Sequence, residues 1–200
     1  MKTYKLHIIR HGMTDGNLKG QYIGRTELPV TPEGITMLNN LKNQIEYPFV
    51  DRVYSSPMLR CRQTANVIYP DREITLIDNL IEYDFGEFEG KTAHELEHLE
   101  AYKDWASGKV GCTPGGEDNM EFAKRICLGI NEIVRDMMNN DYSDAAVFMH
   151  GGTIMTFLAS CAVPRHSLVE WATENGRGYT IMVTPTLYQR SGIVEVIDLI

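Results

Sequence analysis

Short apolar runs alternate with stretches of helical periodicity along the whole chain. Continuous or alternating apolar residues predict buried strands, whereas apolar residues three and four positions apart predict amphipathic helices. The predicted strands span residues 4–9, 52–54, 73–77, 145–149, 179–184 and 193–197. The predicted helices span residues 33–45, 57–68, 118–139 and 153–162. This alternation predicts an α/β fold, a three-layer α/β/α sandwich with a largely parallel central sheet that helices cover on both faces.

Turn and capping residues mark several boundaries of these elements. Thr31 before Pro32 is typical of an N-cap and a first helical residue, and Pro57 indicates the start of the next helix. Residues 82–116 are rich in acidic side chains and end in Pro114-Gly115-Gly116, so we expect a lid-like excursion over the sheet. No repeat or linker interrupts the chain, which favours one domain over residues 1–200.

Composition excludes several classes of function. The 19 basic and 27 acidic residues give a net charge of -8, which disfavours a nucleic-acid partner. No apolar stretch approaches the ~20 residues that span a bilayer, and the first residues lack the apolar region of a signal peptide, so no membrane partner is expected. The four cysteines show no CxxC spacing, which favours reduced thiols and a cytoplasmic location.

Two predicted strands end in the same way, with a histidine followed by glycine. The first runs into Arg10-His11-Gly12, and the strand at 145–149 runs into His150-Gly151-Gly152. Carboxyl ends of parallel strands meet at one sheet edge, where the two imidazoles can approach each other. Arginine neutralises phosphate oxygens and histidine supplies a nucleophilic nitrogen, while the helix after Gly152 offers free amides to an anion. A purely structural role for His150 is equally compatible with this pattern alone.

A third strand exit, at residues 55–65, places Arg60 near the start of a helix, where it can reach the same edge. Arg62, two positions later, cannot share that face and is expected in solvent. With these segments the chain resembles the histidine phosphatase superfamily, which includes cofactor-dependent phosphoglycerate mutases and related phosphatases. The matching segments span the chain: Arg10-His11-Gly12 with Thr14 and Asn17, Gly24-Arg25, Leu28-Pro29 to Thr31, Gly34, 55–65, Leu80-Ile81-Glu82, Phe85-Gly86, Glu89-Gly90, Pro114-Gly115-Gly116-Glu117 and His150-Gly151-Gly152.

The resemblance implies a phosphoglycerate mutase-like fold and a role for each matching residue. His11 would be the nucleophile that forms a phosphohistidine, and Glu82 would be the proton donor. The phosphoryl oxygens would be held by Arg10, Arg60, His150 and Asn17. Substrate contacts are also expected at Thr14, Gly24 and Gly151, with no metal and no cofactor. Phosphoryl transfer depends on positioning and charge stabilisation, which these donors supply.

Within the family, the stretch from Glu82 to Gly90 resembles the phosphatase branch, including α-ribazole phosphatase and broad-specificity phosphatases. We therefore expect a histidine acid phosphatase-type phosphomonoesterase that acts on a small phosphorylated metabolite, with α-ribazole phosphate as one candidate. The alternatives are a cofactor-dependent phosphoglycerate mutase and a non-catalytic protein that binds a phosphate ligand. Residues 83–102 would encode substrate choice, although a solvated acidic face explains any one of them equally well. The sequence leaves the physiological substrate and the oligomeric state open.

Two further features test this interpretation. His94 and His98 satisfy the H-E-x-x-H pattern of zinc proteases, but the flanking residues are polar and no third ligand segment follows, which disfavours a metal site. The chain also departs from the common family pattern, with Met155 in place of an arginine and Asp118 in place of a serine. Neither departure removes a proposed catalytic group. His7 is expected to be structural.

Overall fold

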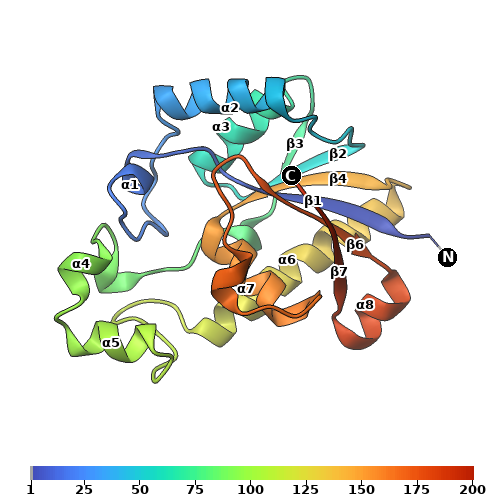
Figure 1. Ribbon diagram of the computed structural model, residues 1–200. Helices are drawn as coiled ribbons and strands as arrows, with labels where there is room; N and C mark the ends of the chain where they lie inside the picture. The colour runs from blue at the N-terminus through green and yellow to red at the C-terminus, as the bar shows by residue number, and fades with distance from the viewer. Residues whose placement is uncertain (1) are drawn as a thin grey trace.

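A seven-stranded sheet runs through the centre of the computed structural model, which describes residues 2–200 (Figure 1). Its strands are β1 (Tyr4–Arg10), β2 (Arg52–Ser55), β3 (Ile74–Leu76), β4 (Asp144–Met149), β5 (Ala162–Val163), β6 (Gly178–Val183) and β7 (Val194–Leu199). They lie in the order β3-β2-β4-β1-β6-β7-β5. β1, β2, β3 and β4 pair in parallel, whereas β6 runs antiparallel to both of its neighbours. The predicted largely parallel sheet is therefore confirmed.

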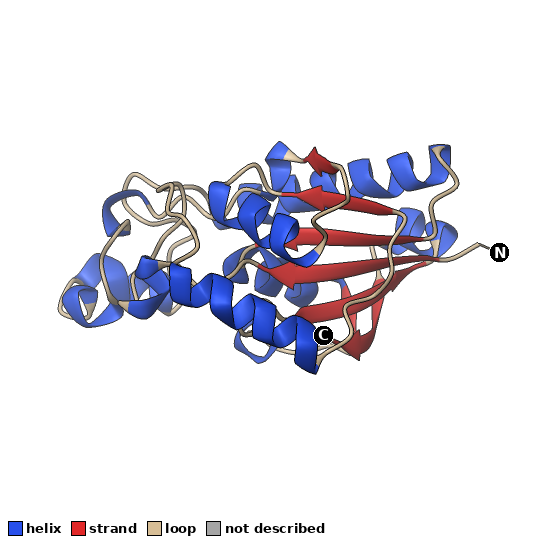
Figure 2. Cartoon of the chain, turned by 90° about the horizontal axis from the view of Figure 1, so that it is seen from above, coloured by secondary structure: helices blue, strands red, loops and turns tan. Residues whose placement is uncertain are grey.

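Helices cover both faces of this sheet, as the view from above also shows (Figure 2). On one face lie α2 (Pro32–Gln44) and α3 (Leu59–Ile68), and on the other lie α6 (Asn119–Asn139) and α7 (Gly151–Cys161) (Figure 1). Side chains along β1 alternate between the two hydrophobic cores that result. Leu6 and Ile8 pack with residues of α6 and α7, and Ile9 packs with residues of α2 and α3. The three-layer α/β/α arrangement is thus confirmed.

Residues 82–116 leave the sheet and form a separate cluster of short helices, at the left of Figure 1. The segment contains η2 (Gly86–Phe88), α4 (Ala93–Leu96) and α5 (Glu100–Ala106), and η1 (Asp78–Leu80) precedes it. The indole of Trp105 lies 5.7 Å from the ring of Tyr22 and 6.2 Å from that of Tyr83. These ring contacts pack α5 against the loop after β1, so the excursion has an aromatic core of its own.

Side-chain oxygens cap two of these helices, one of them at the predicted N-cap Thr31. The Thr31 hydroxyl accepts a hydrogen bond from the Gly34 amide at 3.0 Å, and Pro32 is the first residue of α2. Asp118 caps α6 by accepting from the amides of Met120 and Glu121 at 2.8 and 3.2 Å. The aspartate therefore supplies the oxygen that a serine at this position would supply.

Some boundaries differ from the prediction. The helix expected from Pro57 begins at Leu59, because residues 57 and 58 still turn the chain out of β2. The helix expected from Thr153 begins at Gly151, directly after His150. Short elements were not predicted because they are too brief to show a period: α1 (Asp15–Leu18), β5, η3 (Leu168–Trp171) and α8 (Pro185–Ser191).

Between residues 2 and 200, no helix has both the length and the apolar content that crossing a bilayer would require.

Candidate active site

The parallel pairing of β1 with β4 brings the two histidines together. Arg10 pairs with Met149 in the register of the strands, and the His11 amide donates to the Met149 carbonyl at 3.0 Å. The next residues are therefore neighbours, and the rings of His11 and His150 lie 5.3 Å apart at 64°. The predicted meeting of the two imidazoles at one sheet edge is confirmed.

A main-chain carbonyl fixes the protonation pattern of His11. Its Nδ1 lies 2.8 Å from the Gly12 carbonyl oxygen, which can only accept, so Nδ1 carries the proton and Nε2 keeps a free lone pair. The side chain is buried, and burial together with the charge of Arg60 lowers its pKa to about 3. His11 is thus a neutral imidazole at physiological pH, the form that a nucleophile requires.

Arg60 reaches the site from the first turn of α3 and is almost fully buried, with 1% of its surface exposed. Its Nε donates to His150 Nδ1 at 3.1 Å, and its terminal nitrogens donate to the carbonyls of Thr26 and Gly24 at 2.9 and 2.8 Å. Arg62 is exposed, as its position on the helix predicts. The guanidinium therefore lies beside both imidazoles without an acidic partner among these three acceptors.

His150 is neutral for similar reasons. Because Nδ1 accepts from Arg60, Nε2 carries the proton, and it lies 2.8 Å from the Ser56 hydroxyl oxygen. Burial and the charge of Arg60 lower the pKa of His150 well below its usual value. The single N–H of this ring therefore donates to Ser56, beside His11.

Arg10 provides a second, partly buried guanidinium at this edge. One terminal nitrogen donates to the Thr173 carbonyl at 2.6 Å, while its buried Nε has no hydrogen-bond partner among the described residues. Gly151, the first residue of α7, lies against this side chain, and a Cβ there would be in ordinary contact at 3.4 Å from that Nε. An unpaired buried donor is costly unless a ligand satisfies it, which makes the Arg10 Nε suitable for an anionic oxygen.

Glu82 lies at the N-terminus of α7, where the sequence predicts a site for an anion. The Gly152 amide donates to one carboxylate oxygen at 2.8 Å, and the Thr153 hydroxyl and the Tyr83 amide donate to the other at 3.2 and 2.9 Å. A Cβ on Gly152 would lie 2.7 Å from the carboxylate. The free end of the helix thus holds the proposed proton donor.

The remaining predicted residues surround the site through main-chain and capping contacts. Thr14 caps α1, and the side-chain oxygen of Asn17 accepts from the Thr14 amide at 3.0 Å and from Asn175 Nδ2 at 3.3 Å. The side-chain nitrogen of Asn17, Nδ2, is therefore the group that can donate to a ligand. Gly24 accepts from Arg60, and a Cβ at this residue would clash with the Tyr83 carbonyl at 1.8 Å.

Sequence reasoning missed three supporting residues. Asn175 donates to the His11 carbonyl at 2.8 Å, but it lies alone in a loop and no pattern marks it. The Thr64 hydroxyl accepts from the Gly12 amide at 2.7 Å. Its position four residues after Arg60, on the same face of α3, is a signal that could have identified it. Arg125 donates to the Ile81 and Glu82 carbonyls at 2.6 and 3.0 Å, and no pattern in the sequence marks it.

The H-E-x-x-H segment does not form a continuous helix. α4 ends at Leu96, between the two histidines, and the His94 side chain is 90% exposed with its Nδ1 2.9 Å from a Glu97 carboxylate oxygen. Within residues 2–200, no group of three or more His, Cys, Asp or Glu side chains is placed to hold a metal ion.

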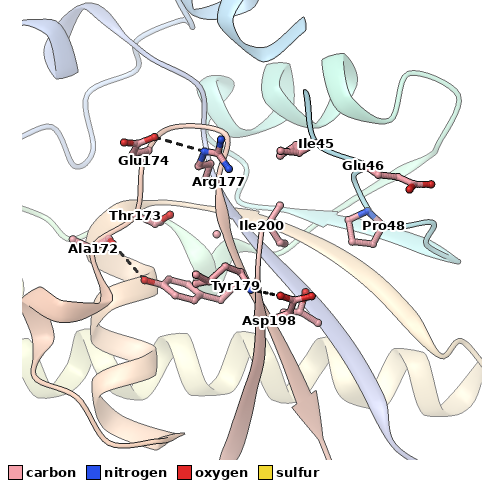
Figure 3. Close-up of a pocket in the computed structure, with 13 residues that line it drawn as sticks. Ile45, Glu46, Pro48, Ala172, Thr173, Glu174, Arg177, Tyr179, Asp198 and Ile200 are labelled. Atoms are coloured by element: carbon pink, nitrogen blue, oxygen red, sulfur yellow. Dashed lines mark hydrogen bonds and ion pairs between the residues drawn. The ribbon is translucent and has the colours of Figure 1, made fainter. Parts of the chain in front are cut away.

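Two cavities flank the loop at residues 172–177. One of about 470 Å³ lies between this loop and the end of β7, with Tyr179, Arg177 and Asp198 among its walls (Figure 3). The other, of about 810 Å³, lies on the α2 side and includes Arg10, Met13 and Asn175. His11 and Glu82 line neither, since each exposes only 5% of its surface.

Comparison with known proteins agrees with this geometry. The sequence model of the histidine phosphatase superfamily (branch 1) matches residues 6–185. A Hydrogenobacter thermophilus protein named "Putative phosphoserine phosphatase 2" is 32% identical over 75% of this chain and 74% of its own length. The adenosylcobalamin/alpha-ribazole phosphatase of Salmonella typhimurium is 28% identical over 86% of this chain and 87% of its own. The phosphoserine phosphatase of Entamoeba histolytica, solved with 3-phosphoglyceric acid, superposes with a TM-score of 0.77 at 28% identity, covering 98% of this chain and 96% of that one.

Proposed function

The chain belongs to the histidine phosphatase superfamily, and from this premise we propose that it hydrolyses phosphate monoesters of small metabolites through a phosphohistidine on His11. The observation that carries the proposal is the state of His11: the Gly12 carbonyl holds the proton on Nδ1 at 2.8 Å and leaves Nε2 free. Two arginines and a second neutral histidine surround this nitrogen, as a nucleophile for a phosphate dianion requires.

In the first half of the proposed reaction, His11 Nε2 attacks phosphorus and the bond from phosphorus to the ester oxygen breaks. The leaving oxygen takes a proton from the Glu82 carboxyl, so that an alcohol departs and the phosphohistidine remains. The Nε–H of Arg10, the side-chain amide of Asn17 and the free N–H bonds of Arg60 would hold the phosphoryl oxygens. The His150 N–H would join them by exchanging its Ser56 partner for a phosphoryl oxygen. Negative charge on the bound phosphate would favour the protonated carboxyl on Glu82.

The second half returns the enzyme to its starting state. Water attacks the phosphorus of the phosphohistidine, gives a proton to the Glu82 carboxylate, and the bond from phosphorus to Nε2 breaks. Inorganic phosphate leaves, and His11 and Glu82 regain their original protonation. If cleavage of the ester, which requires the protonated Glu82 carboxyl, limits the rate, activity is highest at acidic pH, as in a histidine acid phosphatase.

We further propose that a small phosphorylated metabolite is the substrate and that the protein works in the cytoplasm. Relatives named for phosphoserine and α-ribazole phosphate support a small ester. Thr14, Gly24 and Gly151 would shape the pocket around it, and the excursion at 82–116 would cover its leaving group. The four cysteines are free thiols, which fits a reducing compartment.

Incubation with p-nitrophenyl phosphate and with a panel that includes phosphoserine and α-ribazole 5'-phosphate tests the proposal. We expect phosphate release that His11→Ala abolishes, and acid-labile phosphate trapped on His11 in the parent protein. Isomerisation of phosphoglycerate faster than phosphate release would instead assign a mutase. A protein that binds these esters without labelling or turnover would be a binding module, and the proposal would be wrong.

A further inference from the structure

The guanidinium of Arg125 connects α6 to the segment that carries Glu82. It makes five hydrogen bonds, one for each of its five N–H donors. Three end on main-chain carbonyls, those of Asn79, Ile81 and Glu82, at 2.9, 2.6 and 3.0 Å. Two end on the two carboxylate oxygens of Glu117, at 2.6 and 2.9 Å. No donor of the side chain is left for any other partner.

The segment that receives these bonds has little regular structure to hold it. Residues 81–85 belong to no helix or strand, so their carbonyls depend on donors from elsewhere in the fold. Arg125 supplies two such donors, to the carbonyls of Ile81 and Glu82, from a long helix whose inner face is buried in the core. The planar fork of arginine can serve several acceptors at fixed angles, which a lysine ammonium cannot do.

Glu117 strengthens this attachment from the other side. The pair is largely buried, with 16% and 15% of the two side chains exposed. The Glu117 amide donates to the Asp84 carbonyl at 3.0 Å, and its carbonyl accepts from the Tyr83 hydroxyl. The chain before and after Glu82 is therefore tied to the same ion pair.

We propose that Arg125 is a positioning residue for proton transfer, which fixes the main chain around Glu82 so that its carboxyl meets the ester oxygen that leaves. The inference rests on the proposed function, because it requires Glu82 to be the proton donor. The Arg125 side chain makes none of its five bonds to His11, Arg10 or Arg60. Its loss should therefore impair protonation of the leaving group more than nucleophilic attack. Displacement of a reacting group by about 1 Å can lower a rate about 100-fold.

Two substrates separate these effects. p-Nitrophenolate departs readily without a proton, whereas the alkoxide of an alkyl phosphate such as β-glycerophosphate needs one. The measured quantity is kcat/KM, which reports the steps through the first cleavage, for each substrate. We expect Arg125→Gln to lose roughly 10- to 100-fold on the alkyl ester and less than about 3-fold on p-nitrophenyl phosphate. A loss of folded protein would lower both values equally and leave their ratio unchanged.

Matched variants complete the test. Lys124→Gln removes the neighbouring positive charge on an exposed side chain of α6 and should keep the parent's ratio. Arg125→Lys keeps the positive charge but lacks the planar guanidinium, so it should shift the ratio of the two kcat/KM values in the same direction. If Arg125→Gln does not fold, the result for Arg125→Lys decides between the two roles. Equal losses on both substrates would overturn the inference and leave Arg125 a purely structural residue. Glu82→Gln separates the two failures: if it too leaves the ratio unchanged, Glu82 is not the proton donor and the proposed function fails at that point.

Discussion

Buried neutral histidines should make the stability of this protein fall as the pH drops below about 6.5. Burial lowers the pKa of His7, His11 and His150, and that of His11 reaches about 3. An unfolded histidine has a pKa of about 6.5, so between these values the unfolded chain binds a proton that the folded chain does not. The free energy of unfolding therefore decreases as pH falls through this window.

The pKa of His11 sets the size of the effect. Between pH 6.5 and pH 5 the unfolded chain binds one more proton at this residue, and the free energy of unfolding falls by about 1.4 kcal/mol per pH unit. Over these roughly 1.5 units, His11 alone lowers the free energy of unfolding by about 2 kcal/mol. Buried carboxylates and capping acids contribute only at lower pH, since unfolded Asp and Glu titrate near 4. The interval between pH 7 and pH 5 thus isolates the histidines.

Urea unfolding of the parent and of His11→Asn at pH 7, 6, 5.5 and 5 measures this contribution. The substitution removes the titrating ring, so the loss of stability between pH 7 and pH 5 should shrink by about 2 kcal/mol, whatever the variant's stability at pH 7. His98→Asn, at an exposed position, is the control and should follow the parent. Parallel curves for the parent and His11→Asn would refute the assignment of a buried neutral imidazole.

Two other substitutions probe the contacts that arrange the site. Gly152→Ala places a methyl group 2.7 Å from a Glu82 oxygen and should displace that carboxyl. We expect at least a roughly 10-fold loss of kcat/KM on an alkyl phosphate, with little change in melting temperature. Activity within twofold of the parent would contradict this expectation. Asn175→Ala removes one of the donors that orient the Asn17 side-chain amide. It should raise the inhibition constant of inorganic phosphate several-fold, because that amide is then held by Thr14 alone. An unchanged inhibition constant would show that the other contacts of Asn17 suffice.

Periodic segments were predictable from the sequence because burial imposes their patterns. The stripe Phe122, Ile126, Ile130, Ile133 and Met137 predicts α6, and every one of these side chains is buried. Hydrophobic pattern also predicted that His11 and His150 lie at one edge of the sheet. Each histidine directly follows an apolar segment, and such segments form neighbouring buried strands of one sheet. Their 5.3 Å separation required only that β1 and β4 be neighbours.

Contacts made by the main chain were not predictable in this way. The acceptor that fixes the His11 proton is the Gly12 carbonyl, and every residue has a carbonyl, so no residue type marks it. Asn175 and Arg125 act on His11 and on the Glu82 segment from loops and helices far away in sequence. The antiparallel direction of β6 was likewise not predictable. It depends on the path of the chain between β5 and β6, and the hydrophobic pattern of a strand is the same in either direction.

The placement of charge in the site explains how one arrangement can serve both the proposed nucleophile and a phosphate ligand. Arg60 is buried, yet its acceptors are two carbonyls and a neutral imidazole, so no carboxylate neutralises it directly. Such a buried cation is costly to hold, and a phosphate dianion would offset that cost on binding. Until then, the same positive charge opposes protonation of His11 and so preserves its lone pair. The carboxyl of Glu82 instead accepts from the Gly152 amide at the N-terminus of α7 and is none of the three acceptors of Arg60.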